Sequence, residues 1–200
     1  MDFLYKDIEI KVSFWFAFGI CFCLCIVESK ILRYAVLFSL LHECGHLLMH
    51  YICHTKPREI RFSLLGMTIV ETEDATLSYK AERFIAFGGP LVNLSFFSIF
   101  LLCFYFTKSE KILTIAFINF FIFAFNSLPI FSLDGGRILE SFLLEHIVDL
   151  ERALRLEKLI SFVCTLCLFF VGFYILIHSH TNFFLLLLSI YLFLVLFKNI

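Results

Sequence analysis

The sequence has few charged residues and almost no proline, and these shortages exclude several classes of protein. Only 16% of its 200 residues are Asp, Glu, Lys or Arg, the formal net charge is −1, and there are 3 prolines. No dense block of Lys and Arg occurs, so the composition argues against a nucleic-acid partner. Apolar residues make up 61% of the chain, including 29 Phe, and the mean hydropathy is +0.95. This composition predicts a protein embedded in a lipid bilayer.

The eight cysteines do not predict a disulfide framework. Within apolar stretches Cys behaves as a small hydrophobic residue. Cysteines in such stretches include Cys21, Cys23, Cys25, Cys103, Cys164 and Cys167. Binding of a soft metal ion by these groups is the less favoured alternative.

Six apolar segments have the length of a membrane span, or nearly so. They are Val12–Val27, Ile31–Tyr51, Phe84–Phe106, Ile112–Phe131, Leu159–Ile177 and Phe183–Phe197. The first segment lacks a small-residue cleavage site and is followed directly by Glu28, so we interpret it as a retained span rather than a signal peptide. The sequence therefore predicts an all-α polytopic membrane protein of about six transmembrane helices, organised as a single membrane-embedded domain over residues 1–200.

The distribution of basic residues predicts the orientation of these spans. The N-terminal segment, the 54–83 loop, the 132–158 segment and the C-terminus together hold 12 of the 16 Lys and Arg residues. Loops rich in Lys and Arg remain on the cytoplasmic side. We therefore expect a multi-pass protein of the cell membrane with both termini in the cytoplasm.

The loop between the second and third spans predicts a small β-hairpin. Residues Glu59–Leu64 alternate between polar and apolar, Gly66 can turn the chain, and Met67–Glu71 is rich in β-forming residues. The alternative is a surface loop with two weak strands. If the hairpin forms, its exposed edge could pair with an extended peptide substrate.

The pentapeptide His42-Glu43-Cys44-Gly45-His46 lies inside the second apolar segment. Two histidines four residues apart share one face of a helix and can bind one divalent metal ion, while the adjacent Glu43 can act on a water molecule there. Cys44 should face away from the metal. A carboxylate at this depth costs several kcal/mol unless a metal, a partner or a wet cavity receives it. We therefore expect a zinc site.

A catalytic zinc site normally has three protein ligands, so a third must come from elsewhere in the chain. Asp134 follows Pro129 and precedes Gly135-Gly136, where a broken helix can turn a carboxylate inward. Two alternatives stay open from the residues alone. Asp134 could instead cap the helix that follows, or the ligand could be one of the downstream glutamates, Glu140, Glu145 or Glu151.

Three motifs occur in a fixed order along the first 140 or so residues: His42-Glu43-Cys44-Gly45-His46, Gly88-Gly89-Pro90-Leu91-Val92-Asn93, and Asn126-x-x-Pro129 with Leu133-Asp134-Gly135-Gly136. In this order they resemble the site-2 protease family of intramembrane zinc metalloproteases, particularly its compact bacterial branch, which includes the stage IV sporulation protease acting on a sigma-factor precursor. The resemblance implies one Zn²⁺ per chain bound by His42, His46 and Asp134, with Glu43 as general base.

The resemblance also implies a membrane-associated protein or peptide as substrate. We expect a metal-binding core over residues 31–147 and accessory spans over 159–197, the latter assigned only by counting apolar segments. Regulatory membrane proteins are further candidate partners. The tetrahedral intermediate of peptide hydrolysis needs a hydrogen-bond donor besides the metal. Asn126 is the preferred donor because it precedes the helix break, and Asn93 is the alternative. Either asparagine could instead form hydrogen bonds between helices.

Two other functions are compatible with these residues. A metal-ion transporter would use the same side chains as a translocation site, but transporters usually show related halves, and no such repeat is visible in the sequence. A catalytically inactive membrane scaffold would be indicated by loss of Glu43 or of a ligand, and none is lost. The sequence therefore favours an intramembrane zinc metalloendopeptidase.

Overall fold

The computed structural model describes residues 2–5, 8–14, 18, 29–55, 57–63, 66–71, 77–179 and 183–198. The chain divides into two compact units, Met1–Phe125 and Asn126–Ile200, which are described separately here. Most of the predicted first span, Val12–Val27, lies outside the described residues. The single-domain organisation stays a prediction.

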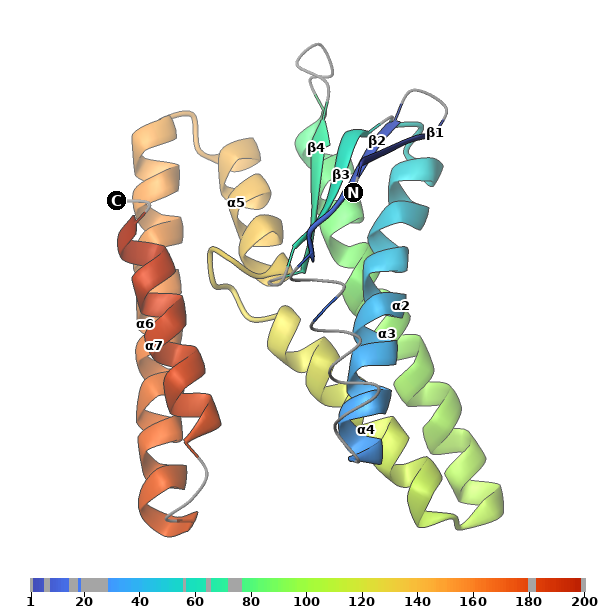
Figure 1. Ribbon diagram of the computed structural model, residues 1–200. Coiled ribbons are helices and arrows are strands. Elements are labelled where there is room, and N and C mark those ends of the chain that lie inside the picture. Colours follow the sequence, from blue (N-terminus) through green and yellow to red (C-terminus); the bar gives the residue numbers. More distant parts are fainter. Residues whose placement is uncertain are drawn as a thin grey trace. The chain divides into compact units, whose positions relative to one another are not determined.

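Two long helices, α2 (Lys30–Ile52) and α3 (Tyr79–Thr107), form the centre of the first unit (Figure 1). Each begins at a serine N-cap whose hydroxyl accepts a hydrogen bond from a backbone N–H three residues later. After α3 the chain turns through Lys108, which has a left-handed backbone conformation, and continues into α4 (Glu110–Asn126). These caps fix where the apolar helices begin.

Helices α2 and α3 approach most closely at a pair of glycines. A Cβ atom built on Gly45 would lie 2.5 Å from the carbonyl oxygen of Gly88. A Cβ atom built on Gly88 would likewise lie 2.5 Å from the carbonyl oxygen of Gly45. Small residues at such crossings allow two membrane helices to pack backbone to backbone. Farther along the same interface, the Phe38 ring lies edge-on against Phe96 and Phe100, with centroids 5.3 and 5.7 Å away.

A four-stranded sheet accompanies these helices: β1 (Asp2–Tyr5), β2 (Ile8–Val12), β3 (Pro57–Ser63) and β4 (Gly66–Glu71), in the order β1-β2-β3-β4. The predicted hairpin is confirmed, because β3 and β4 pair antiparallel. Strands β1 and β2 were not expected from the sequence, and β2 pairs parallel with β3.

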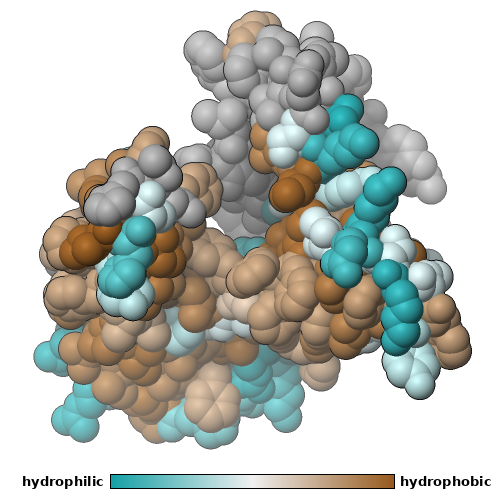
Figure 2. Space-filling model, turned by 90° about the horizontal axis from the view of Figure 1, so that it is seen from below, coloured by the Kyte–Doolittle hydropathy of each residue, from teal (hydrophilic) through white to brown (hydrophobic). Residues whose placement is uncertain are grey.

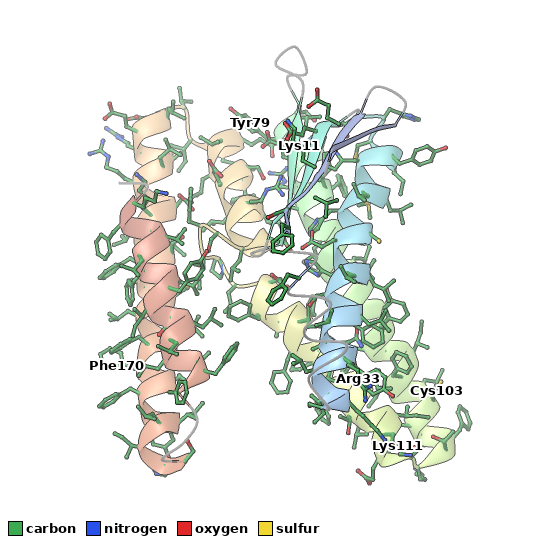
Figure 3. All side chains as sticks on the ribbon, in the orientation of Figure 1. Lys11, Arg33, Tyr79, Cys103, Lys111 and Phe170 are labelled. Atoms are coloured by element: carbon green, nitrogen blue, oxygen red, sulfur yellow. The ribbon has the colours of Figure 1, made fainter. Side chains whose placement is uncertain are left out.

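Lys11, labelled in Figure 3, joins β2 to β3 electrostatically. Its amino group lies 3.0 Å from a carboxylate oxygen of Glu59 and 3.1 Å from one of Glu9. Hydrogen bonds to these two carboxylates, with that to Glu59 the larger effect, raise the pKa of Lys11 above its ordinary value. The ion pair with Glu59 therefore links β2 to β3.

The second unit contains α5 (Asp134–His146), α6 (Leu150–Ser179) and α7 (Phe184–Lys198). Helices α6 and α7 pack closely where Gly172 meets the backbone of Leu186, since a Cβ on Gly172 would lie 2.8 Å from the Leu186 nitrogen. Phe193 of α7 also packs against Phe162 and Phe169 of α6. Helix α5 in turn contacts α6.

Among the described residues, three helices are long and apolar enough to cross a bilayer: α2, α3 and α6. Helix α7 is apolar but shorter. Apolar side chains cover much of the face seen in Figure 2, and Cys103 and Phe170 point outward from their helices in Figure 3. Exposed apolar side chains on long apolar helices suit a lipid environment, so the prediction of a helical membrane protein is confirmed.

Two predicted spans have different boundaries in the structure. The fourth, Ile112–Phe131, ends at Asn126, because Pro129 lacks a backbone N–H and the chain leaves the helix before it. The fifth, Leu159–Ile177, belongs to a helix that begins at Leu150. Residues 150–158 are therefore the first turns of α6.

Candidate metal centre

His42 and His46 lie on the buried face of α2, with only 4% and 5% of their surfaces exposed. Because they are one helical turn apart, their rings project side by side. Their Nε2 atoms are 3.2 Å apart. The structure thus brings the two predicted histidine ligands together.

The other ring nitrogen of each histidine faces a hydrogen-bond acceptor. His42 Nδ1 lies 2.6 Å from Asn93 Oδ1, and His46 Nδ1 lies 2.8 Å from the carbonyl oxygen of Ile85. A neutral imidazole carries its proton on the nitrogen that faces an acceptor. Both Nε2 atoms then present lone pairs to the same space and cannot hydrogen-bond to each other. Two converging lone pairs suit a bound cation, and the outward Nδ1 bonds are typical of metal-binding histidines.

The orientation of the Asn93 amide is fixed by its neighbours. Its Nδ2 donates to the carbonyl oxygen of Phe38 at 3.4 Å and to Asn119 Oδ1 at 3.1 Å. The Asn119 amide in turn donates to the carbonyl oxygen of Ile115. With both of its N–H groups engaged, Asn93 must present its oxygen to His42. Three helices, α2, α3 and α4, therefore contribute to holding one imidazole.

Gly89 keeps open the space next to the histidines. A Cβ atom at this position would collide with the Nε2 atoms of both His42 and His46. The following residue, Pro90, is buried inside α3 and interrupts its backbone hydrogen bonding. The Ile85 carbonyl, which accepts from His46, lies about one turn before this proline. The Gly-Pro pair thus clears room at the metal-facing nitrogens.

Glu43 is half-buried and follows His42 directly on α2, whereas Cys44 is exposed. The next histidine on the same face, His50, is buried and its Nδ1 bonds to Thr55 Oγ1 at 2.7 Å. Cys44 therefore lies on a different face of α2 from His42 and His46, as predicted.

Asp134 belongs to the second unit. It is the first residue of α5 and is half-buried, while Leu133 occupies the N-cap position. Gly135 and Gly136 pack directly against backbone atoms of residues 127–131, which leaves no room for a side chain at either glycine. Of the alternative glutamate ligands, Glu145 and Glu151 are exposed, and Glu151 forms a salt bridge of 3.3 Å with Arg155. Asn126, the candidate oxyanion donor, is the last residue of α4.

Comparisons with known proteins bear on the identity of this site. Residues 108–171 match the model of peptidase family M50. The whole fold is similar to that of the site-2 protease from Methanocaldococcus jannaschii, with a TM-score of 0.59, 19% sequence identity and coverage of 99% of this chain and 94% of that one. The predicted resemblance to the site-2 proteases is confirmed. The family match supports a peptidase, and the structural similarity shows a shared fold. None of the curated proteins that were compared matches the chain in sequence.

Three contributors to the candidate metal centre were not predicted from the sequence: the Asn119 amide, the Ile85 carbonyl and the space left by Gly89. The role of Asn119 could have been predicted from the sequence, because a polar side chain inside an apolar span is expected to have a structural or functional partner. The role of the Ile85 carbonyl could not have been predicted, since it depends on how α2 and α3 cross.

Proposed function

We propose that the protein is an intramembrane zinc metalloendopeptidase that cleaves a membrane-associated protein substrate within or near the bilayer. The observation that carries the proposal is the pair of histidine Nε2 atoms, 3.2 Å apart and buried, with both Nδ1 atoms facing acceptors. Two buried imidazoles whose Nε2 atoms converge while their Nδ1 atoms face acceptors are typical of metal-binding histidines. One zinc ion per chain suits imidazole ligands in a tetrahedral catalytic site.

We assign the third ligand to Asp134. The proposed donor set is the two buried imidazoles of His42 and His46 together with the half-buried carboxylate of Asp134. Two histidines and one carboxylate are an established ligand combination for catalytic zinc. The resemblance of the Leu133-Asp134-Gly135-Gly136 motif to that of the site-2 proteases supports this role, and the tight packing of Gly135 and Gly136 gives the backbone of Asp134 a defined position.

Bound zinc would polarise the scissile carbonyl and make an attacking water more acidic. Glu43 would accept the proton of that water and deliver it to the departing amine. We propose Asn126 as a hydrogen-bond donor to the developing oxyanion. Asn93 is unsuited to that task, because both of its amide hydrogens already bond to Phe38 and Asn119. Its interactions are between helices, and they orient His42.

We further propose that both units act as one metalloprotease domain over residues 1–200, with both termini in the cytoplasm. The positive-inside distribution of Lys and Arg supports this orientation. By analogy with the compact bacterial branch, a sigma-factor precursor, an anti-sigma factor or a remnant signal peptide is the candidate substrate class. Regulatory membrane proteins are the candidate partners.

The experiment that tests the activity compares membrane fractions from cells producing the native protein or Glu43→Gln. Removing the general base should leave zinc bound, as measured by elemental analysis, and abolish the appearance of cleavage fragments detected by proteomics of the membrane fraction. Glu151→Gln is the matched control, because Glu151 is exposed and bonds to Arg155 on the same helix. Identical fragment patterns for the native protein and Glu43→Gln would refute the assignment.

A further inference from the structure

The chain leaves regular structure between α4 and α5, over residues 127–133, immediately before Asp134. This segment, called the connector below, bonds to itself through Ile130 N–H to Leu128 O and Leu133 N–H to Ile130 O, both at 2.8 Å. Irregular backbone at membrane depth requires partners for its remaining polar groups, since lipid supplies none. The position of the connector therefore depends on what those partners are.

One partner is a side chain of α6. Ser161 is fully buried, and its Oγ accepts a hydrogen bond of 3.0 Å from the N–H of Phe131. The same oxygen lies 3.4 Å from the Pro129 carbonyl oxygen and 3.5 Å from Oε1 of Glu157. A serine hydroxyl has one proton to donate and lone pairs to accept. Ser161 can thus bind both a donor and an acceptor of the connector at once.

Helix α5 holds the connector from another direction. Gly135 lies against the backbone of Ser127 and Leu128, and Gly136 lies against the backbone of Ile130. The Ile130 side chain is itself almost fully buried. The backbone that leads to Asp134 is therefore fixed by close packing to α5 and by hydrogen bonds to α6.

The polar residues of α6 have a pattern that supports this role. Glu157, Ser161 and Thr165 follow one another at four-residue spacing, and each is at most 1% exposed. Buried polar side chains are costly in an apolar helix and usually serve an interaction. Thr165 satisfies its hydroxyl locally by donating to the Ser161 carbonyl oxygen at 2.8 Å. The contacts of Ser161, in contrast, reach out of the helix to the connector.

We propose that Ser161 is a positioning residue that fixes the connector, and through it the carboxylate of Asp134, in the geometry that metal binding requires. Glu157 assists by lying within reach of the Ser161 hydroxyl. This proposal rests on the proposed function, in which Asp134 is a zinc ligand. It assigns a task to α6, which carries none of the three motifs described in the sequence analysis.

The test measures metal binding by purified, detergent-solubilised protein. Ser161→Ala should lower the affinity for Zn²⁺, determined by competition with a chelator of known affinity, by about 10-fold, which is the lower end of the effect of outer-shell partners. It should also change the d–d absorption spectrum of the Co²⁺-substituted protein, because the ligand geometry is altered. Thr165→Ala is the matched control. It removes a buried hydroxyl from the same helix face and should leave affinity and spectrum as in the native protein.

A second variant separates positioning from packing. Ser161→Cys keeps the volume of the side chain but replaces the oxygen with a weak acceptor, so it should reproduce the loss of affinity even if Ser161→Ala leaves a harmful cavity. Native-like zinc affinity and an unchanged Co²⁺ spectrum in Ser161→Cys would overturn the positioning proposal alone. Failure of the native protein itself to bind Zn²⁺ or Co²⁺ would instead overturn the proposed function.

Discussion

Asn93→Leu should weaken zinc binding although the substituted residue does not touch the metal. The change conserves side-chain volume approximately, but it removes the Oδ1 acceptor that lies 2.6 Å from His42 Nδ1. The imidazole can then carry its proton on Nε2, which withdraws the lone pair from the metal site. Loss of such a partner lowers metal affinity by about 10–100-fold, equivalent to about 1.4–2.8 kcal/mol.

The same substitution also removes the two hydrogen bonds that Asn93 donates to Phe38 O and Asn119 Oδ1. A buried acceptor that loses its donor costs about 1–3 kcal/mol, so the metal-free protein should unfold at a lower temperature. Stability and metal affinity must therefore be measured separately. Asn119→Leu serves as a discriminating variant, because it removes one bond of the same network but leaves the His42–Asn93 bond in place.

Zinc affinity would be determined by chelator competition, and unfolding of the zinc-free protein by a thermal melt in detergent. We expect both variants to be destabilised, Asn93→Leu to lose 10-fold or more in zinc affinity, and Asn119→Leu to lose less, because its His42–Asn93 bond remains. Ser98→Ala provides the baseline, since its exposed hydroxyl bonds to the Leu94 carbonyl within α3. Equal zinc affinities for Asn93→Leu and Ser98→Ala would refute the idea that Asn93 sets the protonation of His42.

Three further substitutions give separate tests. Gly89→Ala should reduce zinc occupancy at least 10-fold by elemental analysis, because its methyl group would collide with Nε2 of His42 and His46; full occupancy would contradict the geometry. Asp134→Ala should yield protein without stoichiometric zinc, and a full complement would exclude Asp134 as a ligand. Gly172→Val should lower the melting temperature without changing zinc affinity, because the added side chain meets the Leu186 backbone; an unchanged melt would show that α6 and α7 do not need this contact.

Much of the fold followed from local sequence patterns. Long apolar segments predicted the helices, since a bilayer demands helices whose backbone groups bond internally. The β3–β4 hairpin followed from alternation and the turn at Gly66. Strands β1 and β2 did not, because each is short and the second of them pairs with β3, more than forty residues later in the chain. Pairing over such a separation leaves no local pattern.

The candidate site also has some features that the sequence predicts and others that it does not. The spacing of His42 and His46 alone predicted that they share a face, because four residues correspond to about one helical turn. The acceptors at their Nδ1 atoms come from another helix, and one of them is the backbone carbonyl of Ile85. A backbone atom has no residue-specific signal in the sequence. Only the crossing of α2 and α3 reveals it.

The crossing of α2 and α3 determines how the two histidines are oriented. Gly45, between the two histidines, packs against Gly88, and the next residue, Gly89, lies against the imidazoles. The closest approach of α2 and α3 therefore coincides with the metal-facing nitrogens, so that α3 can supply Asn93 Oδ1 and the Ile85 carbonyl as acceptors. Because lipid offers no water to orient the rings, these contacts must hold both Nε2 lone pairs inward before any metal arrives. The glycines of the two motifs are thus as necessary to the ligand geometry as the histidines.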